Sequence, residues 1–219
     1  RDTTIGDLYS FNTGGARACQ EFGFSHAGGN LREGVRFACH TTVLGTNARH
    51  IATSNRSGAK QDQLVAVVGS PGLFASAMFD AEALGFEKLD VDRQRLLLEP
   101  TPKLTVMEAM MEAKLVSSSS DSSYSLFEAI YNICEASSVS VDLNIDRWKL
   151  SDSVVRTSKR MGIEPWRMAL MWGDWNVVVT IEDANLVEIS EICAEQGVDF
   201  VQLGVVGSSN PSVNAVSCG

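Results

Sequence analysis

The sequence predicts a domain in which helices cover a β-sheet, of the α+β (layered α/β) class. Two observations support this class. Short β-branched runs such as Leu64–Val68 and Val177–Ile181 are continuous enough for buried strands. Helical patterns, the strongest of which begins at Leu126, alternate with these runs along the chain. Alternating strands and helices are typical of a sheet that packs against helices.

The composition is that of a soluble globular protein. Of the 219 residues, 44% are hydrophobic and 21% are charged. The net charge of -9 and the lack of a dense Lys/Arg run argue against nucleic-acid binding. There is no signal peptide and no apolar run of the ~20 residues that a membrane span needs. The scattered cysteines favour reduced thiols in a cytoplasmic protein, and the histidines lack zinc-site spacing.

The N-terminal part of the chain predicts one helix and one strand. Two glycines precede a short helix over Ala16–Gly23, which Gly23 closes. Val35–Leu44 alternates apolar and polar residues, as a half-buried strand does. The polar segment Asn47–Lys60 is interpreted as a connection between two domains. Because the opening residues resemble mid-domain sequence, we expect that an N-terminal part is missing.

The next segment predicts a strand–turn–helix unit. The strand Leu64–Val68 runs through the turn Gly69–Gly72 into an apolar helix over Leu73–Leu84. A glycine-rich turn at this position can aim backbone N–H groups at an anion. The sequence lacks the Walker Lys-Ser/Thr pair and the spaced glycines of a dinucleotide site, which favours a plain turn. Another helix is predicted over Val106–Val116.

The serine-rich segment Ser117–Ser125 allows two interpretations. It is low in complexity, as flexible links are, and its Ser and Asp residues are natural N-caps for the helix that begins at Leu126. Alternatively, Asp121 and Ser123 offer oxygen ligands to a metal ion or a phosphate at the helix start. The sequence alone leaves both interpretations open.

The C-terminal elements follow the same patterns. We expect strands over Val139–Ile145 and Phe200–Val206. Helices are predicted over Ser151–Met161 and over Asp183–Gln196, with the Asp183 side chain as the cap of the second. The tail from Gly207 is small and polar, and we expect it to be loose.

The stretch Ile163–Ile181 is the most distinctive candidate site. After a proline, a short helix ends at a Gly173-Asp174 turn, and a β-branched strand follows. Trp172 and Trp175 flank the turn. This order places a carboxylate and two large rings at the mouth of a buried sheet, where ligand sites in α/β proteins tend to lie.

Four motifs follow one another at compatible spacing. They are Gly28-Gly29-Asn30-Leu31, Arg56–Lys60, Asp121–Leu126 with the following Cys134–Val139, and Trp172–Asn176 ahead of a strand. Together they resemble the ATP-binding superfamily of aminoimidazole ribonucleotide (AIR) synthetase, and within it most closely the thiamine-monophosphate kinases. The resemblance covers nearly the whole chain.

This resemblance implies an AIR synthetase-like two-domain fold whose N-terminal domain is incomplete in this chain. Residues 1–55 would be the remainder of an N-terminal ATP-binding and dimerisation domain. Residues 56–219 would form a C-terminal α/β domain. The resemblance also implies a head-to-head homodimer that binds ATP and Mg²⁺ between its domains, together with a small-molecule substrate.

The resemblance also assigns roles to individual residues. Asp121 and Asp174 would be catalytic, and Asn30 and Asp121 would hold the metal. The remaining roles are nucleotide binding, by Gly28, Gly29, Asn30 and Ser123, and substrate binding, by Trp172, Gly173, Trp175 and Asn176. Several positions depart from the family, and two of them, Asn30 and Tyr124, each replace an aspartate. The loss of two acidic ligands argues against thiamine phosphate as the substrate.

These features support an ATP- and Mg²⁺-dependent, kinase-like phosphotransferase that acts on an unidentified small molecule. Catalysis in such enzymes is largely positioning and charge stabilisation around phosphate. One alternative is an ATP-dependent synthetase or dehydratase of the same superfamily, which phosphorylates an amide or carboxylate oxygen. The other is a degenerate member that binds a nucleotide without catalysis or serves as a scaffold.

Overall fold

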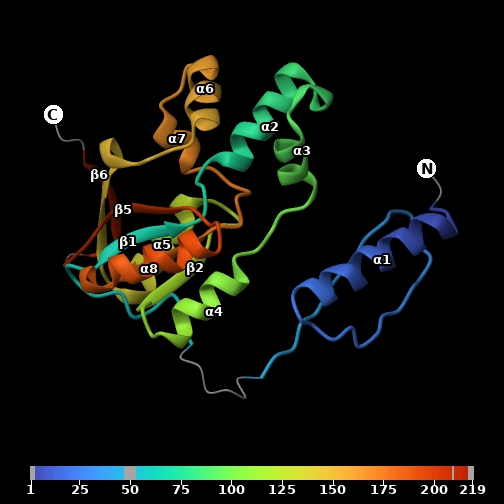
Figure 1. Cartoon of the computed structure of the whole chain (residues 1–219), viewed down its shortest axis with the longest axis horizontal. Helices are drawn as coiled ribbons and strands as arrows, with labels where there is room; N and C mark the ends of the chain where they lie inside the picture. Colours follow the sequence, from blue (N-terminus) through green and yellow to red (C-terminus); the bar gives the residue numbers. More distant parts are fainter. Residues whose placement is uncertain (1–2, 47–52, 209, 217–219) are drawn as a thin grey trace. The chain divides into compact units, whose positions relative to one another are not determined.

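A computed structural model describes residues 3–46, 53–208 and 210–216. The chain divides into two compact units, Arg1–Arg49 and His50–Gly219, which are described separately below (Figure 1). The assignment of residues 1–55 to the remainder of an ATP-binding and dimerisation domain stays a prediction.

The first unit contains one long helix, α1 (Ile5–Glu21). Its start is fixed by a capping box, in which the Asp7 amide donates to the Thr4 hydroxyl (3.1 Å) and the Thr4 amide donates to the Asp7 carboxylate (2.8 Å). The helix predicted over Ala16–Gly23 is therefore the last part of a longer one. Gly23, with a φ of 70°, follows its end as predicted.

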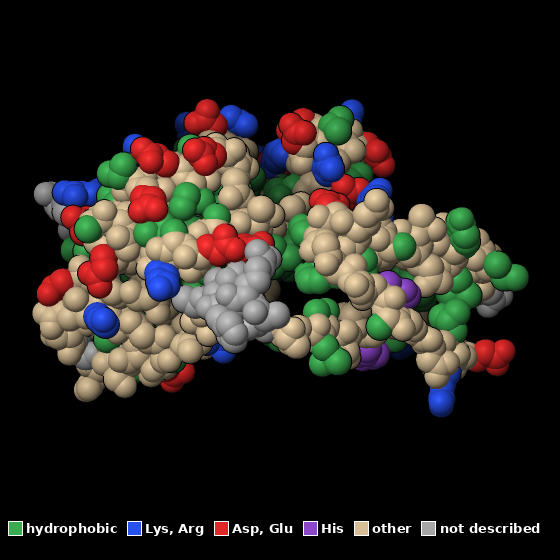
Figure 2. Space-filling model, turned by 60° about the horizontal axis from the view of Figure 1, so that its bottom comes forward, with side chains coloured by type: hydrophobic (Ala, Val, Ile, Leu, Met, Phe, Trp, Pro, Cys, Tyr) green, Lys and Arg blue, Asp and Glu red, His purple; other side chains and the backbone are tan. Residues whose placement is uncertain are grey.

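The strand predicted over Val35–Leu44 is not formed. These residues have no regular secondary structure, and every one of them is exposed. A strand needs a neighbour that satisfies its N–H and C=O groups, and residues 3–46 contain no second strand. Large apolar side chains of this unit, such as Val35 and Leu44, are consequently exposed. Figure 2 shows hydrophobic side chains at the surface of the molecule.

The second unit is built on a mixed six-stranded sheet, whose strand order is β2-β4-β1-β5-β3-β6 (Figure 1). Every neighbouring pair is antiparallel except β3 and β6, which are parallel. The strands are β1 (Leu64–Val68), β2 (Ser118–Asp121), β3 (Ser140–Asn144), β4 (Val177–Ile181), β5 (Phe200–Gly207) and β6 (Ser212–Val216).

Helices form layers on both faces of this sheet. Helix α5 packs on one face, and α4 and α8 pack on the other. Helices α2, α3, α6 and α7 form a separate helical lobe beside the sheet (Figure 1). The helices are α2 (Leu73–Leu84), α3 (Val91–Leu98), α4 (Leu104–Glu112), α5 (Leu126–Ser137), α6 (Asp152–Met161), α7 (Pro165–Ala169) and α8 (Leu186–Glu195). Short 3₁₀ turns cover Phe86–Lys88, Ile145–Arg147 and Asp183–Asn185.

The alternation of side chains along β1 divides the core in two. Val65 and Val67 face α5 and pack in one core cluster with Ile130 and other residues of that helix. Leu64, Ala66 and Val68 face α4 and α8 on the other side, where Met110 is fully buried. All five residues of β1 are buried because the strand is central and covered on both faces, as its continuous apolar run predicts.

A buried carboxylate ties the helical lobe together. Asp80 of α2 accepts hydrogen bonds from Arg93 of α3 (2.6 Å) and from Arg160 and Thr157 of α6 (2.5 and 2.8 Å). Burial of Asp80 raises its pKa, but the hydrogen bonds from Arg160, Arg93 and Thr157 outweigh this effect, so that the pKa lies below its ordinary value. The ionised carboxylate therefore links three helices.

Three expectations for the second unit are wrong. The tail from Gly207 is not loose where it is described: Ser212–Val216 forms β6, because the Asn214 amide bonds Asp142 of β3 (2.9 Å) and Val213 packs against the core. Asp183 does not cap a helix but begins a 3₁₀ turn, and α8 starts at Leu186.

The third concerns the serine-rich segment, where the flexible-link interpretation fails. Ser118–Asp121 is an edge strand that pairs with β4, and the hydroxyls of Ser118 and Thr180 share a hydrogen bond of 2.7 Å. The capping interpretation is confirmed, since the Ser125 hydroxyl accepts from the Glu128 amide at the start of α5 (3.0 Å).

Candidate functional site

The residues predicted to form the site lie in three segments. Gly28, Gly29 and Asn30 belong to the first unit, where they are exposed and have no regular secondary structure. In the second unit, Asp121 is the last residue of β2, and Ser123 lies two positions further along the chain. The segment Trp172–Asn176 leads into β4. The pairing of β2 with β4 brings the two segments of the second unit together.

The end of β2 presents an exposed carboxylate. Asp121 is the last residue of the strand, and its side chain accepts a short hydrogen bond from the Ser123 hydroxyl. Ser122, between them, is buried, and its amide donates to the Asn176 carbonyl (2.9 Å). This fixed turn aims Asp121 and Ser123 at solvent beside the start of α5, where the helix dipole favours anions. Tyr124, 80% exposed, lies in the same turn.

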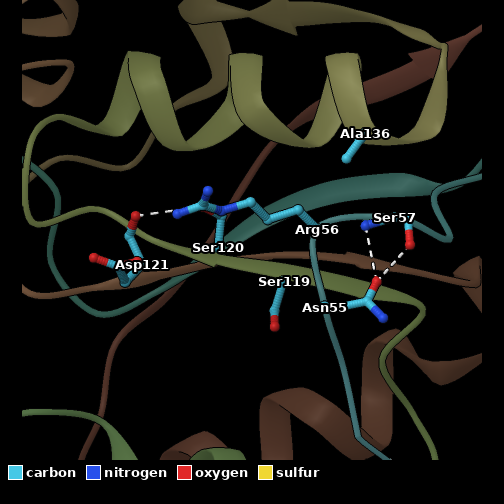
Figure 3. A pocket seen from close by; sticks show the side chains of 7 residues that line it. All are labelled: Asn55, Arg56, Ser57, Ser119, Ser120, Asp121 and Ala136. Atoms are coloured by element: carbon cyan, nitrogen blue, oxygen red, sulfur yellow. Dashed lines mark hydrogen bonds between the residues drawn. The ribbon is translucent and has the colours of Figure 1, made fainter.

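Residues 55–59 form a strap along the outer edge of β2, and this strap contributes the cationic side chain of Arg56. The Asn55 carbonyl accepts from the Ser119 amide (2.8 Å), so the strap follows the free edge of β2. The Ser137 hydroxyl, on α5, donates to the Arg56 carbonyl (3.1 Å). The Arg56 side chain extends from the strap toward Asp121 (Figure 3). The sequence contains this arginine in a recognised motif, but the site residues predicted from that sequence did not include it.

Two cavities meet at these side chains. One, of about 550 Å³, lies between the strap and β2 and is lined by Asn55, Arg56, Ser57, Ser119, Ser120, Asp121 and Ala136 (Figure 3). The other, of about 250 Å³, lies at the start of α5. Arg56 and Asp121 line both cavities. A guanidinium suits phosphate oxygens, and a carboxylate beside hydroxyls suits a hard cation that bridges to phosphate.

The Gly173-Asp174 turn holds the start of α2. The Asp174 carboxylate accepts from the backbone amides of Gly72 (2.5 Å) and Phe74 (2.7 Å). Burial raises the pKa of Asp174 to about 6, although these amides and the Lys103 ammonium pull it down. Asp174 is thus a partly buried carboxylate that anchors the β1–α2 loop, a role not visible in the sequence.

The rings beside this turn pack on α2 and remain partly exposed. Trp175 meets Phe74 edge to face, with ring centroids 5.4 Å apart, and Trp172 meets Phe79 at 6.1 Å. Gly173 lies under the Phe74 ring at a φ of 93°, and a Cβ there would be 2.3 Å from the ring. The turn therefore requires glycine, and each tryptophan keeps a free surface for a ligand.

A cavity of about 300 Å³ opens beside Asp174. It is lined by this turn and by the α3–α4 connection, which contributes Lys103. Burial lowers the pKa of Lys103, and the charges of Asp174 and Asp199 oppose that shift. The cavity therefore combines a ring edge, a carboxylate and an ammonium group, as a pocket for a polar small molecule does.

Asn176 joins the two segments instead of lining a cavity. It is only 2% exposed. Its amide donates to the Ser122 hydroxyl (3.1 Å), and its carbonyl accepts from Ser122 in return. Because Asp121 also pairs with Val177 across the sheet, the Asp121 turn and the Asp174 turn lie at the ends of adjacent strands.

Over residues 3–46, 53–208 and 210–216, no three His, Cys, Asp or Glu side chains gather closely enough to hold a metal ion. Within the same ranges, no helix has the length and apolar character to cross a membrane.

Comparison with known proteins identifies one family model and several similar structures. The model described as AIR synthase related protein, C-terminal domain, matches residues 60–214. The thiamine-monophosphate kinase of Aquifex aeolicus is 20% identical with a TM-score of 0.72, over 98% of this chain and 69% of the kinase. That of Stenotrophomonas maltophilia is 18% identical with a TM-score of 0.65, over 74% and 52%. No curated protein matches the sequence.

A hydrogenase maturation protein shares the same fold. E. coli HypE is 10% identical with a TM-score of 0.59, over 76% of this chain and 49% of HypE. Identities this low establish the fold alone. The chain spans about half to two thirds of the length of these proteins.

Proposed function

We propose a function from the premise that the chain belongs to the AIR synthase-related family through its C-terminal domain. The proposed function is that of an ATP- and Mg²⁺-dependent phosphotransferase acting on a small molecule. The observation that carries this proposal is the grouping of Arg56, Asp121 and Ser123 at the start of α5. Arg56 and Asp121 line two adjoining cavities, and Ser123 lines the second of them. A similar structure, AaThiL, is 19% identical to this chain and is in complex with AMPPCP and TMP. We further propose a cytoplasmic homodimer.

The residues at this position fit a nucleotide phosphate and its magnesium ion in chemical type. Mg²⁺ is commonly held by one or two carboxylates, substrate phosphates and water. Asp121 would supply the carboxylate, with Ser123 as a neutral oxygen donor. For the first unit by itself, we propose a role for Asn30 in metal binding and for Gly28 and Gly29 in nucleotide binding. Arg56 would bind phosphate. When bound, Mg²⁺ neutralises charge on the transferring phosphoryl group.

The acceptor would lie at the neighbouring turn. Trp172 and Trp175 expose ring surface, and Gly173 and Asp174 line the cavity that contains Lys103. Asp174 acts as a positioning residue, because its oxygens hold the α2 amides. Asn176 would act only indirectly, by joining this turn to the Asp121 turn.

One observation favours a second candidate. Among the described residues no cluster of three metal-binding side chains exists, and the aspartate of the family motif is Tyr124 in this chain. This is what a nucleotide-binding protein without catalysis would show. A synthetase or dehydratase remains the other alternative and would release inorganic phosphate.

An ADP-release assay distinguishes these candidates. The purified protein is incubated with ATP, Mg²⁺ and a panel of small alcohols, phosphate monoesters, amides and carboxylates. A phosphotransferase forms ADP and a phosphorylated acceptor in equal amounts, and Asp121→Ala abolishes both. Formation of ADP with free phosphate and a dehydrated or cyclised product would contradict phosphotransfer, as would a lack of acceptor-dependent ADP with every compound.

A further inference from the structure

We propose that the chain has a second small-molecule site, independent of the proposed function, which binds a free apolar α-amino acid in the cavity between β3, β5 and α8. This cavity has a volume of about 810 Å³. That volume lies within the range of roughly 300–1,000 Å³ that is usual for ligand sites. Its lining combines cations, hydrogen-bond acceptors and apolar surface.

The cavity lies on the sheet face opposite α5, toward the β6 edge. Val141 and Leu143 of β3 face α5, so the intervening residues, Asp142 and Asn144, face the cavity side. Helix α8 borders the cavity through Leu186. Asp121 lies four strands away in the order of the sheet, which corresponds to about 19 Å at the usual strand spacing. The two sites are therefore separate.

A β-bulge shapes the floor of the cavity. The pairing between β1 and β5 shifts between Val65 and Ala66, which leaves Leu203 without a partner between Gln202 and Gly204. Bulges of this kind often lie beside functional sites, where they redirect side chains. A Cβ at Gly204 would lie 2.0 Å from the Asp142 carbonyl oxygen, so glycine is needed for β5 to approach β3 here.

Two cations border one side of the cavity. Arg147 and Lys149 flank Trp148, which is buried and donates its ring N–H to the Leu203 carbonyl (2.8 Å). Because Trp148 has extended backbone angles, its two neighbours project together, away from the core. Both are exposed, line the cavity, and form no ion pair with another residue of the described part of the chain. This pair suits a carboxylate.

Acceptors occupy the β3 side. The Asp142 carboxylate is held by the Asn214 amide (2.9 Å) and retains lone pairs for a further donor. The side-chain oxygen of Asn144 is buried and has no hydrogen-bond partner among the described residues. An unsatisfied buried acceptor is costly, and an ammonium group with three donors would satisfy it together with Asp142.

The remaining wall is apolar. Phe200, Leu186, Val205 and Val216 line the cavity, and Val205 and Val216 are 40% and 43% exposed. Covering apolar surface of this kind with a ligand is favourable, because it removes the surface from water. Two cations, two acceptors and an apolar wall match the carboxylate, the ammonium group and the side chain of an apolar amino acid.

The test is calorimetric titration of the full chain with L-leucine. We expect saturable binding that the double variant Arg147→Ala/Lys149→Ala weakens at least about tenfold, as expected when a charge-assisted pair is lost. The matched control Arg156→Ala/Lys159→Ala removes two exposed cations of α6 and should leave binding unchanged.

Two analogues test each end of the ligand. N-acetyl-leucine lacks the ammonium group and leucinamide lacks the carboxylate, and each should bind at least about tenfold more weakly than L-leucine. Absence of L-leucine binding would overturn the proposal, and so would binding that tolerates both analogues or the double variant. Binding of AMPPCP to the same double variant should be unchanged, which separates this result from any failure of the proposed nucleotide site.

Discussion

At the scale of single residues, Asp174 combines a structural role with an unusual ionisation. Its carboxylate caps the start of α2, yet burial raises its pKa to about 6. The sequence identified Asp174 as a candidate from its place between two tryptophans. It could not indicate that both oxygens face backbone amides, because the amides come from a loop a hundred residues earlier.

This ionisation predicts a pH dependence of stability. Since the pKa of Asp174 is higher in the folded chain than the ordinary 3.8, the folded state binds the proton more tightly. The resulting stability is complete below about pH 4 and is lost as the pH rises through about 6, with a maximum change of about 3 kcal/mol. Urea unfolding of the wild type and of Asp174→Asn across this range measures it. A stability difference between the two proteins that stays constant from pH 4 to 7 would contradict the prediction.

Gly173 provides a second test at this scale. Gly173→Ala combines a strained backbone at a φ of 93° with a clash against Phe74, and we expect a loss of about 2–4 kcal/mol in the free energy of unfolding. Gly162→Ala is the matched control, because Gly162 has a φ of 69° but open space around its Cβ, and should cost about 1 kcal/mol. Equal losses in urea denaturation would show that the packing under Phe74 is unimportant.

At the scale of elements, local signals predicted most of the helices and the central strands. The bounds of α2 and β4 agree with expectation, and Gly162 ends α6 in a left-handed conformation as its position indicates. Apart from the Asp183 cap, the errors concern strands whose formation depends on a distant partner. β2 is polar and forms because β4 and the strap over residues 55–59 pair with it. β6 likewise depends on β3.

The helical lobe gives a prediction for tertiary contacts between elements. Arg93→Ala removes one of the two guanidinium partners of buried Asp80, and we expect a loss of about 2–3 kcal/mol in the free energy of unfolding. Arg95→Ala, two residues further along α3, breaks only an exposed pair with Glu99 and should cost less than about 1 kcal/mol. Thermal or urea unfolding compares the variants, and similar losses would show that Asp80 does not hold the lobe.

At the scale of the whole molecule, the second unit has a complete core and the first does not. Among its described residues, α1 has no buried side chain, and the predicted strand Val35–Leu44 lacks a partner. The two-domain organisation is predicted from the polar segment Asn47–Lys60 and from the resemblance to a family. The fold of the second unit bears out that resemblance, with the family model matching residues 60–214. The role of Asn30 as a metal ligand stays a prediction.

The most direct test of the proposed site is calorimetric titration with AMPPCP, with and without Mg²⁺. We predict binding that requires Mg²⁺ and that Asp121→Ala and Arg56→Ala each weaken at least about tenfold, because each removes a charged contact to the metal–phosphate group. The control variant Glu135→Ala, which deletes an exposed carboxylate of helix α5, should bind AMPPCP as the wild type does. Absence of binding in both conditions, or binding that Asp121→Ala leaves unchanged, would contradict a nucleotide site at the end of β2.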